Sequence, residues 1–312
     1  MKIAVVSRSF ARNATLRAEL SAKYPDVTFT ESGEVLDGAS LVAVLRGHDS
    51  AIVGLERIDD RILSLVPELK IISKYGVGLD GLDVDAIARR CIKLAWTGGV
   101  NRRSVSELTL AFAIALVHRV PEASIALRNG DWLKLVGQQL TGRTFGIIGC
   151  GFVGQDLVKL LAPFNCRVLS HDIRDYADFY RAHQVTPVGL YHLLAESDIV
   201  SLHVPLDRST KGMIGPAQLS RMRAGTFLIN AARGGLVDEE ALAEALEGGH
   251  LAGAACDVFQ MEPDANPRLL AAANFLGTPH IGAGTAEAQL AMGRAAIEGL
   301  ENARVPGDGW PC

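Results

Sequence analysis

The chain has 312 residues, of which 48% are hydrophobic and 21% are charged, and its formal net charge is -4 at pH 7. This length favours two domains over one. The mild charge excludes the basic surface of a nucleic-acid-binding protein and the acidic tail of some partner-binding proteins, so a small-molecule partner is expected.

Targeting and membrane segments are not expected. No apolar run reaches the roughly twenty residues that a membrane span needs, and the apolar run at 3–6 is too short for a signal peptide. The five cysteines are odd in number and show no C-x-x-C spacing. This pattern favours reduced thiols, and therefore a cytoplasmic protein, over a disulfide framework.

Short apolar runs rich in valine and isoleucine alternate with helical patterns along the first hundred residues. This alternation predicts parallel strands joined by crossover helices, and hence an α/β domain. The expected strands are 3–6, 27–30, 51–53, 70–73 and 92–95, and the expected helices are 15–23, 59–66 and 84–90.

Residues 104–120 predict one helix, with Ser104 and Glu107 forming a capping box at its start. The apolar residues leave almost no polar face, so this helix is expected to be buried on all sides. An interface between domains and subunits would bury it in this way, which predicts a homodimer. A core helix within one domain explains the same pattern equally well.

The same alternation resumes after this helix, with strands expected at 144–148, 167–170, 199–203, 226–230, 251–257 and 274–277. A last helix, expected at 285–303, would pack back on the first domain. The sequence thus predicts an α/β protein of two doubly wound parallel-sheet domains. They comprise residues 1–100 with 285–312, and residues 101–284.

A strand expected at 144–148 runs into the motif G-x-G-x-x-G and then into a helix. Gly149 permits the tight turn, Gly151 lets the backbone approach a pyrophosphate, and Gly154 allows close packing of helix on strand. The helix start offers unpaired N–H groups to the phosphates. This combination predicts a dinucleotide site in the second domain.

The type of dinucleotide is indicated by Asp172, which follows the next expected strand about twenty residues later. A carboxylate at this place accepts hydrogen bonds from the ribose hydroxyls and repels a 2′-phosphate. Arg174 would offer an alternative contact for such a phosphate. We predict NAD rather than NADP.

Three side chains that suit keto acid reduction follow later strands of the second half: Arg233, Glu262 and His280. Such a reduction needs a cation for the carboxylate, a proton donor for the carbonyl oxygen, and a group that keeps this donor protonated. Arg233, His280 and Glu262 are assigned these roles in that order. Asp257, at the end of a strand, is expected near the nicotinamide ring or in a structural bond.

These motifs together resemble those of the D-isomer-specific 2-hydroxyacid dehydrogenase family, which includes phosphoglycerate dehydrogenases. The resemblance covers almost the whole chain. The segments that carry it are Lys74 to Asp80, Gly149 to Gly154, Ser201 to Leu206, Ile229 to Gly234, Asp257 to Pro263 and Thr278 to Gly282.

The resemblance implies a Rossmann NAD-binding domain, a smaller flavodoxin-like substrate domain, and a catalytic trio of Arg233, Glu262 and His280. It also implies that the backbone of Val77 and Gly78 binds the substrate carboxylate, and that the helix at 104–120 builds a dimer. With the glycine motif, the expected cofactor site comprises Gly149, Gly151, Phe152, Val153, Gly154, Asp172, His203, Val204, Pro205, Thr210, Ala231, Ala232, Arg233, Asp257 and His280.

Two departures from the family pattern bear on the substrate. Asn101-Arg102-Arg103 stands where the family often has Asn-Thr, and no regulatory C-terminal domain of the kind found in some phosphoglycerate dehydrogenases is expected. Lys74, Arg102 and Arg103, added to Arg233, predict a substrate with a second anionic group, such as 3-phosphoglycerate or a phosphonate. The alternative is a glyoxylate or hydroxypyruvate reductase.

Functions of other classes remain open at this stage. A dinucleotide-sensing binding protein such as a corepressor would use the same scaffold, and an adenosylhomocysteine-type hydrolase would require a larger first domain. No group of residues has metal-ligand spacing, so no metal is predicted. Cys150 is expected to be a tolerated small residue in the glycine loop rather than a redox sensor.

Overall fold

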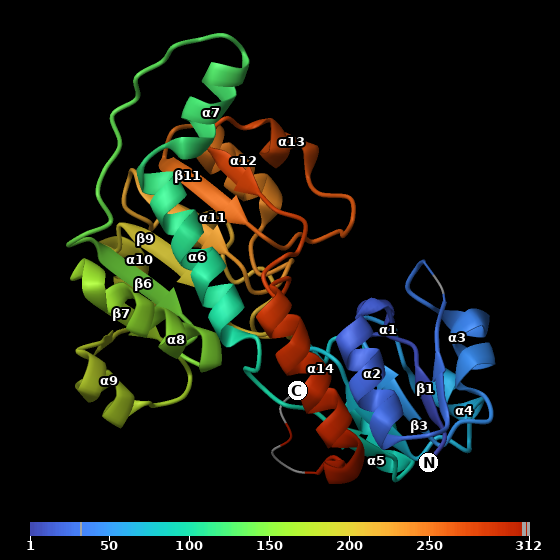
Figure 1. The fold of residues 1–312 in the computed structure, drawn as a ribbon. Coiled ribbons are helices and arrows are strands. Elements are labelled where there is room, and N and C mark those ends of the chain that lie inside the picture. The colour runs from blue at the N-terminus through green and yellow to red at the C-terminus, as the bar shows by residue number, and fades with distance from the viewer. Residues whose placement is uncertain (32, 308–309, 311–312) are drawn as a thin grey trace. The chain divides into compact units, whose positions relative to one another are not determined.

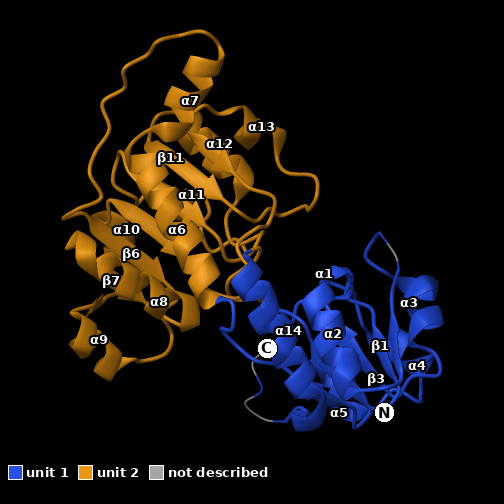
Figure 2. Ribbon diagram, in the orientation of Figure 1, with its two compact units in different colours: residues 1–101, 285–312 blue, residues 102–284 orange. Residues whose placement is uncertain are grey.

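The computed structural model describes residues 1–31, 33–307 and 310 and divides the chain into two compact units (Figures 1 and 2). Unit 1 comprises residues 1–101 and 285–312, and unit 2 comprises residues 102–284. The predicted division, at 100/101 and 284/285, differs from this one by a single residue at the first boundary.

Unit 1 contains a five-stranded parallel sheet with the order β2-β1-β3-β4-β5. This is a doubly wound order of the flavodoxin type, in which the topology switches direction between β1 and β3. The strands are β1 (Ile3–Val5), β2 (Val27–Phe29), β3 (Ser50–Val53), β4 (Ile71–Lys74) and β5 (Lys93–Ala95).

Among the described residues, six helices belong to unit 1, and the last of them comes from the far end of the chain (Figure 2). Ser73 Oγ donates a hydrogen bond of 2.6 Å to Ala296 O, which fixes this last helix, α14, on β4. The helices are α1 (Arg8–Arg12), α2 (Ala14–Lys23), α3 (Gly38–Leu45), α4 (Asp60–Ser64), α5 (Val84–Arg89) and α14 (Ala286–Asn302).

Unit 2 contains a seven-stranded parallel sheet with the order β12-β11-β10-β9-β6-β7-β8, which is the Rossmann order extended by one strand. The predicted fold class of two doubly wound parallel-sheet domains is therefore confirmed. The strands are β6 (Thr144–Ile148), β7 (Arg167–His171), β8 (Thr186–Pro187), β9 (Ile199–Leu202), β10 (Thr226–Asn230), β11 (Leu251–Cys256) and β12 (Phe275–Gly277).

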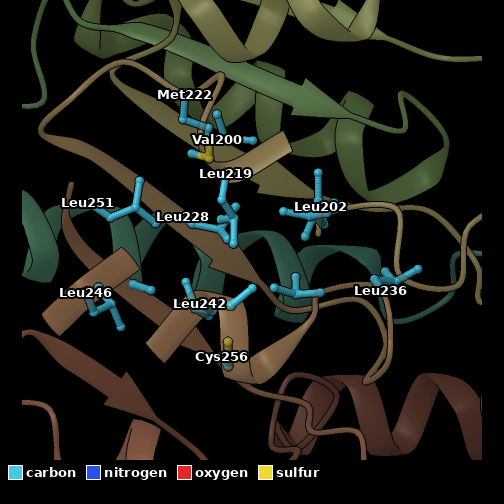
Figure 3. Close-up of a cluster of buried hydrophobic side chains, with 14 of the residues drawn as sticks. Val200, Leu202, Leu219, Met222, Leu228, Leu236, Leu242, Leu246, Leu251 and Cys256 are labelled. Atoms are coloured by element: carbon cyan, nitrogen blue, oxygen red, sulfur yellow. The ribbon is translucent and has the colours of Figure 1, made fainter. Parts of the chain in front are cut away.

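Helices cover both faces of this sheet, so a hydrophobic core forms on each side of it (Figure 1). Figure 3 shows one of the two cores, where leucines from β10 and α12 meet Cys256 of β11. The helices are α6 (Arg102–Val117), α7 (Val120–Arg128), α8 (Phe152–Leu161), the 3-10 helix η1 (Ala162–Phe164), α9 (Ala177–His183), α10 (Leu190–Glu196), α11 (Pro216–Leu219), α12 (Glu239–Glu247) and α13 (Pro267–Ala271).

The structure corrects the predicted start of helix α6. The helix begins at Arg102, so Ser104 lies inside its first turn and forms no capping box with Glu107. Ser104 is buried, and its Oγ donates a hydrogen bond of 2.6 Å to Gly282 O. The serine therefore anchors the helix to the loop after β12, a tertiary role that the local sequence pattern does not reveal.

Helix α6 is a core helix of unit 2, packed on β10, β11 and α8. The opposite face is not fully buried, since Leu110 and Ile114 are half-buried and Ala111 is exposed. Of the two explanations for the apolar pattern, the core helix is the one seen. The dimer stays a prediction.

The predicted single helix at 104–120 is wrong at its end. The chain turns at Arg119, whose φ is 59°, and continues as α7 with Pro121 in its first turn. Among the described residues no single helix has the length and apolar composition of a membrane span. Helices α6 and α7 have this length and composition only when they are taken together, as a pair bent by 66° at the break between them.

Candidate active site

In the glycine loop between β6 and α8, two glycines are packed so tightly against neighbouring backbone that a larger residue would displace it. Gly149 has a φ of +96°, and a Cβ on it would lie 2.6 Å from His203 O. A Cβ on Gly154 would lie 2.2 Å from Gly149 O. The loop therefore lies against the end of β9, and α8 lies against the loop.

Gly151, by contrast, has no atom within 4 Å of where its Cβ would be. Gly151 is the N-cap residue of α8, so the first helical N–H groups, at Phe152 and Val153, have no acceptors within the helix. An open backbone with unpaired donors at a helix N-terminus suits a pyrophosphate. The loop thus fits a dinucleotide.

The carboxylate of Asp172 follows β7 and is held by two main-chain groups. Its Oδ2 accepts a hydrogen bond of 2.6 Å from Cys150 N in the glycine loop, and its Oδ1 accepts one of 2.8 Å from Arg174 N. The acid therefore lies beside the pyrophosphate loop, where the ribose of the dinucleotide is expected. This placement agrees with the preference for NAD.

Cys150, inside the glycine loop, is fully buried. Burial raises the pKa of its thiol to about 11. A thiol that stays protonated and inaccessible is a poor nucleophile and a poor redox sensor. The structure therefore agrees with the prediction of a tolerated small residue.

The imidazole of His203 is turned into the protein rather than outward. Its Nε2 lies 2.9 Å from Ser201 Oγ, and burial lowers the pKa of the ring to about 4. Nδ1 is buried and has no hydrogen-bond partner among the described residues. The ring is therefore neutral and bonded to Ser201, and the His203 backbone lies beside Gly149 of the glycine loop. The predicted contact of His203 with the cofactor stays a prediction.

The loop after β9 is shaped by Thr210. Its Oγ1 donates a hydrogen bond of 2.7 Å to Pro205 O and accepts one of 2.8 Å from Asp207 N. Val204 is half-buried and Pro205 is exposed. Thr210 thus fixes the conformation of the loop that carries these two predicted cofactor contacts.

The loop that carries Arg233 is held by a side chain that the sequence analysis did not single out. Asn230, at the end of β10, accepts a hydrogen bond of 3.1 Å from Ala232 N and donates one of 2.8 Å to Arg233 O. Arg233 Nη1 donates to Ala232 O at 2.7 Å. Because Asn230 is only 2% exposed, it presents Ala231, Ala232 and Arg233 in one defined turn.

Glu262 and His280 form a hydrogen-bonded pair, with 2.8 Å between Glu262 Oε2 and His280 Nδ1. Their side chains are 39% and 46% exposed, so the pair is open to a substrate. The other carboxylate oxygen, Oε1, accepts a hydrogen bond of 3.1 Å from Phe259 N. A carboxylate on Nδ1 orients the ring and leaves Nε2 for proton transfer.

Asp257 holds the main chain of the loop that carries His280. This carboxylate is 1% exposed and accepts hydrogen bonds from Thr278 Oγ1 at 2.6 Å, from Ile281 N at 2.7 Å and from Gly282 N at 2.7 Å. Its backbone oxygen accepts from His280 N at 2.8 Å. Of the two roles considered for Asp257, the structural one is seen, and it holds His280 at its left-handed φ of 54°.

In unit 1 the loop after β4 carries Val77 and Gly78. Trp96 Nε1 donates a hydrogen bond of 2.7 Å to Val77 O, so the indole fixes the orientation of this peptide. Within the described residues, neither Val77 N–H nor Gly78 N–H donates a backbone hydrogen bond. Both are thus available for the predicted carboxylate contact.

Lys74, predicted to contact the substrate, is only 7% exposed. Its ammonium donates a hydrogen bond to Gly54 O. On the other side of the same glycine, Glu56 accepts a hydrogen bond of 2.5 Å from Gly54 N, and this carboxylate is 1% exposed. Lys74 and Glu56 therefore hold the end of β3 from inside unit 1.

Arg103 is engaged within unit 2. Its Nη2 donates a hydrogen bond of 3.0 Å to Asp156 Oδ1, and Ser106 Oγ donates to the other oxygen of the same carboxylate. Asp156 lies on α8 and is buried. Arg103 neutralises its charge, Ser106 hydrogen-bonds it, and both contacts tie α6 to α8. Lys74 and Arg103 are two of the three cations that predicted a second anionic group on the substrate, and both are bonded within their own units. Their contact with the substrate stays a prediction.

Comparisons with known proteins agree with this site. Residues 110–282 match the model of the NAD-binding domain of D-isomer specific 2-hydroxyacid dehydrogenases, so unit 2 is an NAD-binding domain. The chain is 38% identical, over 79% of its length, to a D-3-phosphoglycerate dehydrogenase of Archaeoglobus fulgidus. It is 35% identical, over 86% of its length, to a hydroxypyruvate reductase of Thermotoga maritima.

The chain covers 47% of the Archaeoglobus protein and 88% of the Thermotoga protein, so it spans about half the length of the former. Among solved structures it resembles the TT0316 protein of Thermus thermophilus, with a TM-score of 0.88 and 33% identity, over 98% of this chain and 99% of that one. The chain therefore belongs to the D-isomer specific 2-hydroxyacid dehydrogenase family.

Proposed function

We propose that this protein is an NADH-dependent reductase of small 2-keto acids, which it converts to D-2-hydroxy acids, and that it catalyses the reverse oxidation as well. The observation that carries the proposal is the 2.8 Å hydrogen bond between Glu262 and His280 on an NAD-binding domain. A carboxylate-bound imidazole at the carboxyl edge of such a domain is suited to give a proton to a carbonyl oxygen as hydride arrives at its carbon.

Each residue of the trio has a separate task in this reaction. Bound NADH supplies the hydride. Arg233 holds the substrate carboxylate through its planar guanidinium, and His280 donates the proton from Nε2 to the carbonyl oxygen. Glu262 stabilises the protonated imidazole before proton transfer, and it accepts a hydrogen bond from Nδ1–H before and after this step. In oxidation His280 takes the proton back.

The substrate is proposed to be a monoanionic acid such as hydroxypyruvate or glyoxylate. Support comes from the two cations that already have partners within the protein: buried Lys74 on Gly54 and exposed Arg103 on Asp156. Of the two relatives described above, the hydroxypyruvate reductase is covered over 88% of its length and the phosphoglycerate dehydrogenase over 47%. The second candidate, a phosphorylated or phosphonate acid, is favoured by the exposed Arg102.

A homodimer is proposed from the apolar surface of α7 and the segment that follows it. Trp132 and Val136 are 80% and 89% exposed, and Val120, Ile125, Leu127 and Leu133 are exposed as well. A second copy of this chain, paired about a twofold axis, would cover such a surface. Light scattering at micromolar concentration is expected to give a dimer for the wild type and a monomer for Val136→Asp. A monomeric wild type would contradict the proposal.

A cytoplasmic location is proposed from the cysteines. Cys91, Cys150, Cys166 and Cys256 are all free thiols, as expected for a protein from a reducing compartment. No nucleic acid or membrane partner is proposed. Fractionation of the native host with an antibody against the protein tests the location, and recovery outside the cytoplasm would contradict it.

A panel of keto acids with NADH tests the activity and the substrate class together. Hydroxypyruvate, glyoxylate and pyruvate are compared with phosphohydroxypyruvate and phosphonopyruvate, using wild type, His280→Ala and the double variant Arg102→Ala/Arg103→Ala. We expect a higher kcat/KM for a monoanionic acid and no selective loss in the double variant. No turnover above His280→Ala would leave an NAD-sensing binding protein such as a corepressor as the better explanation.

A further inference from the structure

We propose that Glu239 is a positioning residue for the proton-transfer pair of Glu262 and His280. Glu239 stands in the first turn of α12, and its Oε1 accepts a hydrogen bond of 2.5 Å from Gln260 N in the loop after β11. Glu262 lies two residues beyond Gln260 in the same loop. The inference rests on the proposed function, because it concerns the geometry of that reaction.

The loop between Val258 and Pro263 has two carboxylate contacts that set its path. In the external contact Gln260 N donates to Glu239, and in the internal contact Phe259 N donates to Glu262 Oε1 at 3.1 Å. Two consecutive N–H groups of the loop thus donate to two different carboxylates, one on α12 and one in the loop itself. If the external contact is lost, the peptide next to the one that supports Glu262 loses its acceptor, and the Glu262 carboxylate shifts with the loop.

The same loop abuts the loop that carries Arg233. A Cβ on Gly234 would lie 1.8 Å from Phe259 O and 2.8 Å from Gln260 N. Backbone therefore packs on backbone at this point, without a side chain between the two loops. By binding Gln260, Glu239 holds the loop that carries Glu262 against the loop that carries Arg233. It thereby fixes the distance between Glu262 and Arg233.

Helix capping does not account for Glu239. The N-cap of α12 is Asp238, whose Oδ1 accepts a hydrogen bond of 3.1 Å from Ala241 N. Glu240, the next residue, contacts Asn266 at 2.7 Å and Arg268 at 3.1 Å, on the side of α13. Of these three neighbouring acids, Glu239 alone contacts the loop that carries Glu262. Glu240 provides a matched control, since it has the same charge one residue away.

The variants for the test are Glu239→Ala, Glu239→Gln and Glu240→Ala. Glu239→Ala removes the acceptor of Gln260 N, whereas Glu239→Gln keeps an oxygen there and removes the charge. We expect Glu239→Ala to lower kcat by about ten- to hundred-fold with an unchanged affinity for NADH, since a displacement of about 1 Å costs this much. Glu239→Gln should recover most of this loss, and Glu240→Ala should resemble wild type.

The pH profile of kcat/KM separates positioning from general destabilisation. The acids that face His280 are Glu262 on Nδ1 and Asp257 on its main chain, and Glu239 acts one loop further out. In Glu239→Ala the alkaline limb of the reduction profile should move to lower pH, because a displaced Glu262 stabilises the protonated ring less. An unshifted limb, or equal losses in Glu239→Ala and Glu240→Ala, would overturn the proposal.

Amide hydrogen exchange supplies a readout that needs no turnover. In Glu239→Ala, exchange at residues 259–262 should rise above wild type, while Glu239→Gln and Glu240→Ala should leave it unchanged. Unchanged exchange in Glu239→Ala would refute the positioning role even in an active enzyme. If wild type reduces no keto acid but the exchange pattern holds, the proposed function fails while the contact of Glu239 with the loop stands.

Discussion

Both parallel sheets carry charged side chains at or just beyond the carboxyl ends of their strands, but the two units bury these side chains to different extents. In unit 2 the side chains of His280 and Glu262 are 46% and 39% exposed. In unit 1 Lys74 and Glu56 are 7% and 1% exposed, and both bond to Gly54. A charged residue after a parallel strand thus indicates a reactive site only where the following loop leaves it open.

The strongest test of this contrast is His280→Ala in unit 2. We expect kcat for keto acid reduction to fall by on the order of a hundred- to ten-thousand-fold, the usual contribution of positioned proton transfer. The free energy of unfolding should change by about 1 kcal/mol or less, because the side chain is half-exposed. Steady-state rates and urea unfolding are measured on the same preparation, with NADH binding as control. Retention of a tenth of the activity would argue against His280 as the acid.

For Lys74→Met in unit 1 we expect the opposite: a loss of stability with little change in activity. Losing a buried, charged donor should lower the free energy of unfolding by about 2–3 kcal/mol. The kcat/KM for hydroxypyruvate should stay within a few fold of wild type, because the ammonium is engaged on Gly54. Thermal and urea unfolding check the first expectation. A stable variant with a greatly raised KM would instead support the predicted contact of Lys74 with the substrate.

His203 extends the contrast to a buried titratable group in unit 2. Because burial lowers its pKa to about 4, the unfolded chain binds a proton that the folded chain does not between the ordinary histidine pKa of 6.5 and about 4. Stability from this group is present above pH 6.5 and is lost as the pH falls through that window. At pH 5 the loss is about 2 kcal/mol.

His203→Gln removes this titration. The difference in unfolding free energy between wild type and variant should therefore shrink by roughly 2 kcal/mol from pH 7 to pH 5. Urea unfolding at both values measures it, and the subtraction cancels the carboxylates common to both proteins. A constant difference would show that the ring does not stay neutral on folding.

The smallest effect is expected at Asp172, which is half-buried and thus lies between the two extremes. Asp172→Ser should narrow the preference for NADH over NADPH by about tenfold, or 1.4 kcal/mol, because it removes the repulsion of a 2′-phosphate. The ratio of kcat/KM values for the two coenzymes is the measure. A wild type that prefers NADPH would show that Asp172 has been given the wrong role.

Local sequence signals were sufficient for the strands of both sheets, except the two-residue edge strand β8. Strand β10 lies at 226–230 as predicted, and α14 starts after Thr285, whose Oγ1 caps it. Strand–helix alternation and the glycine motif depend on residues close together in the chain, so they identify the fold class and the dinucleotide loop. Helices α1, α3 and α7 and strand β8 were not predicted. Of these, α1 and β8 have only five and two residues and are too short to show a period.

Side-chain roles that depend on distant partners required the tertiary structure. Ser104 bonds to Gly282, Arg103 to Asp156 and Glu239 to Gln260, across 178, 53 and 21 residues. Nothing in the neighbouring sequence distinguishes such a residue from a helix cap or a solvated charge. The sequence by itself determined which residues stand at the strand ends. Burial and long-range hydrogen bonds, which only folding creates, decided which of them are open to a substrate and which hold the protein together.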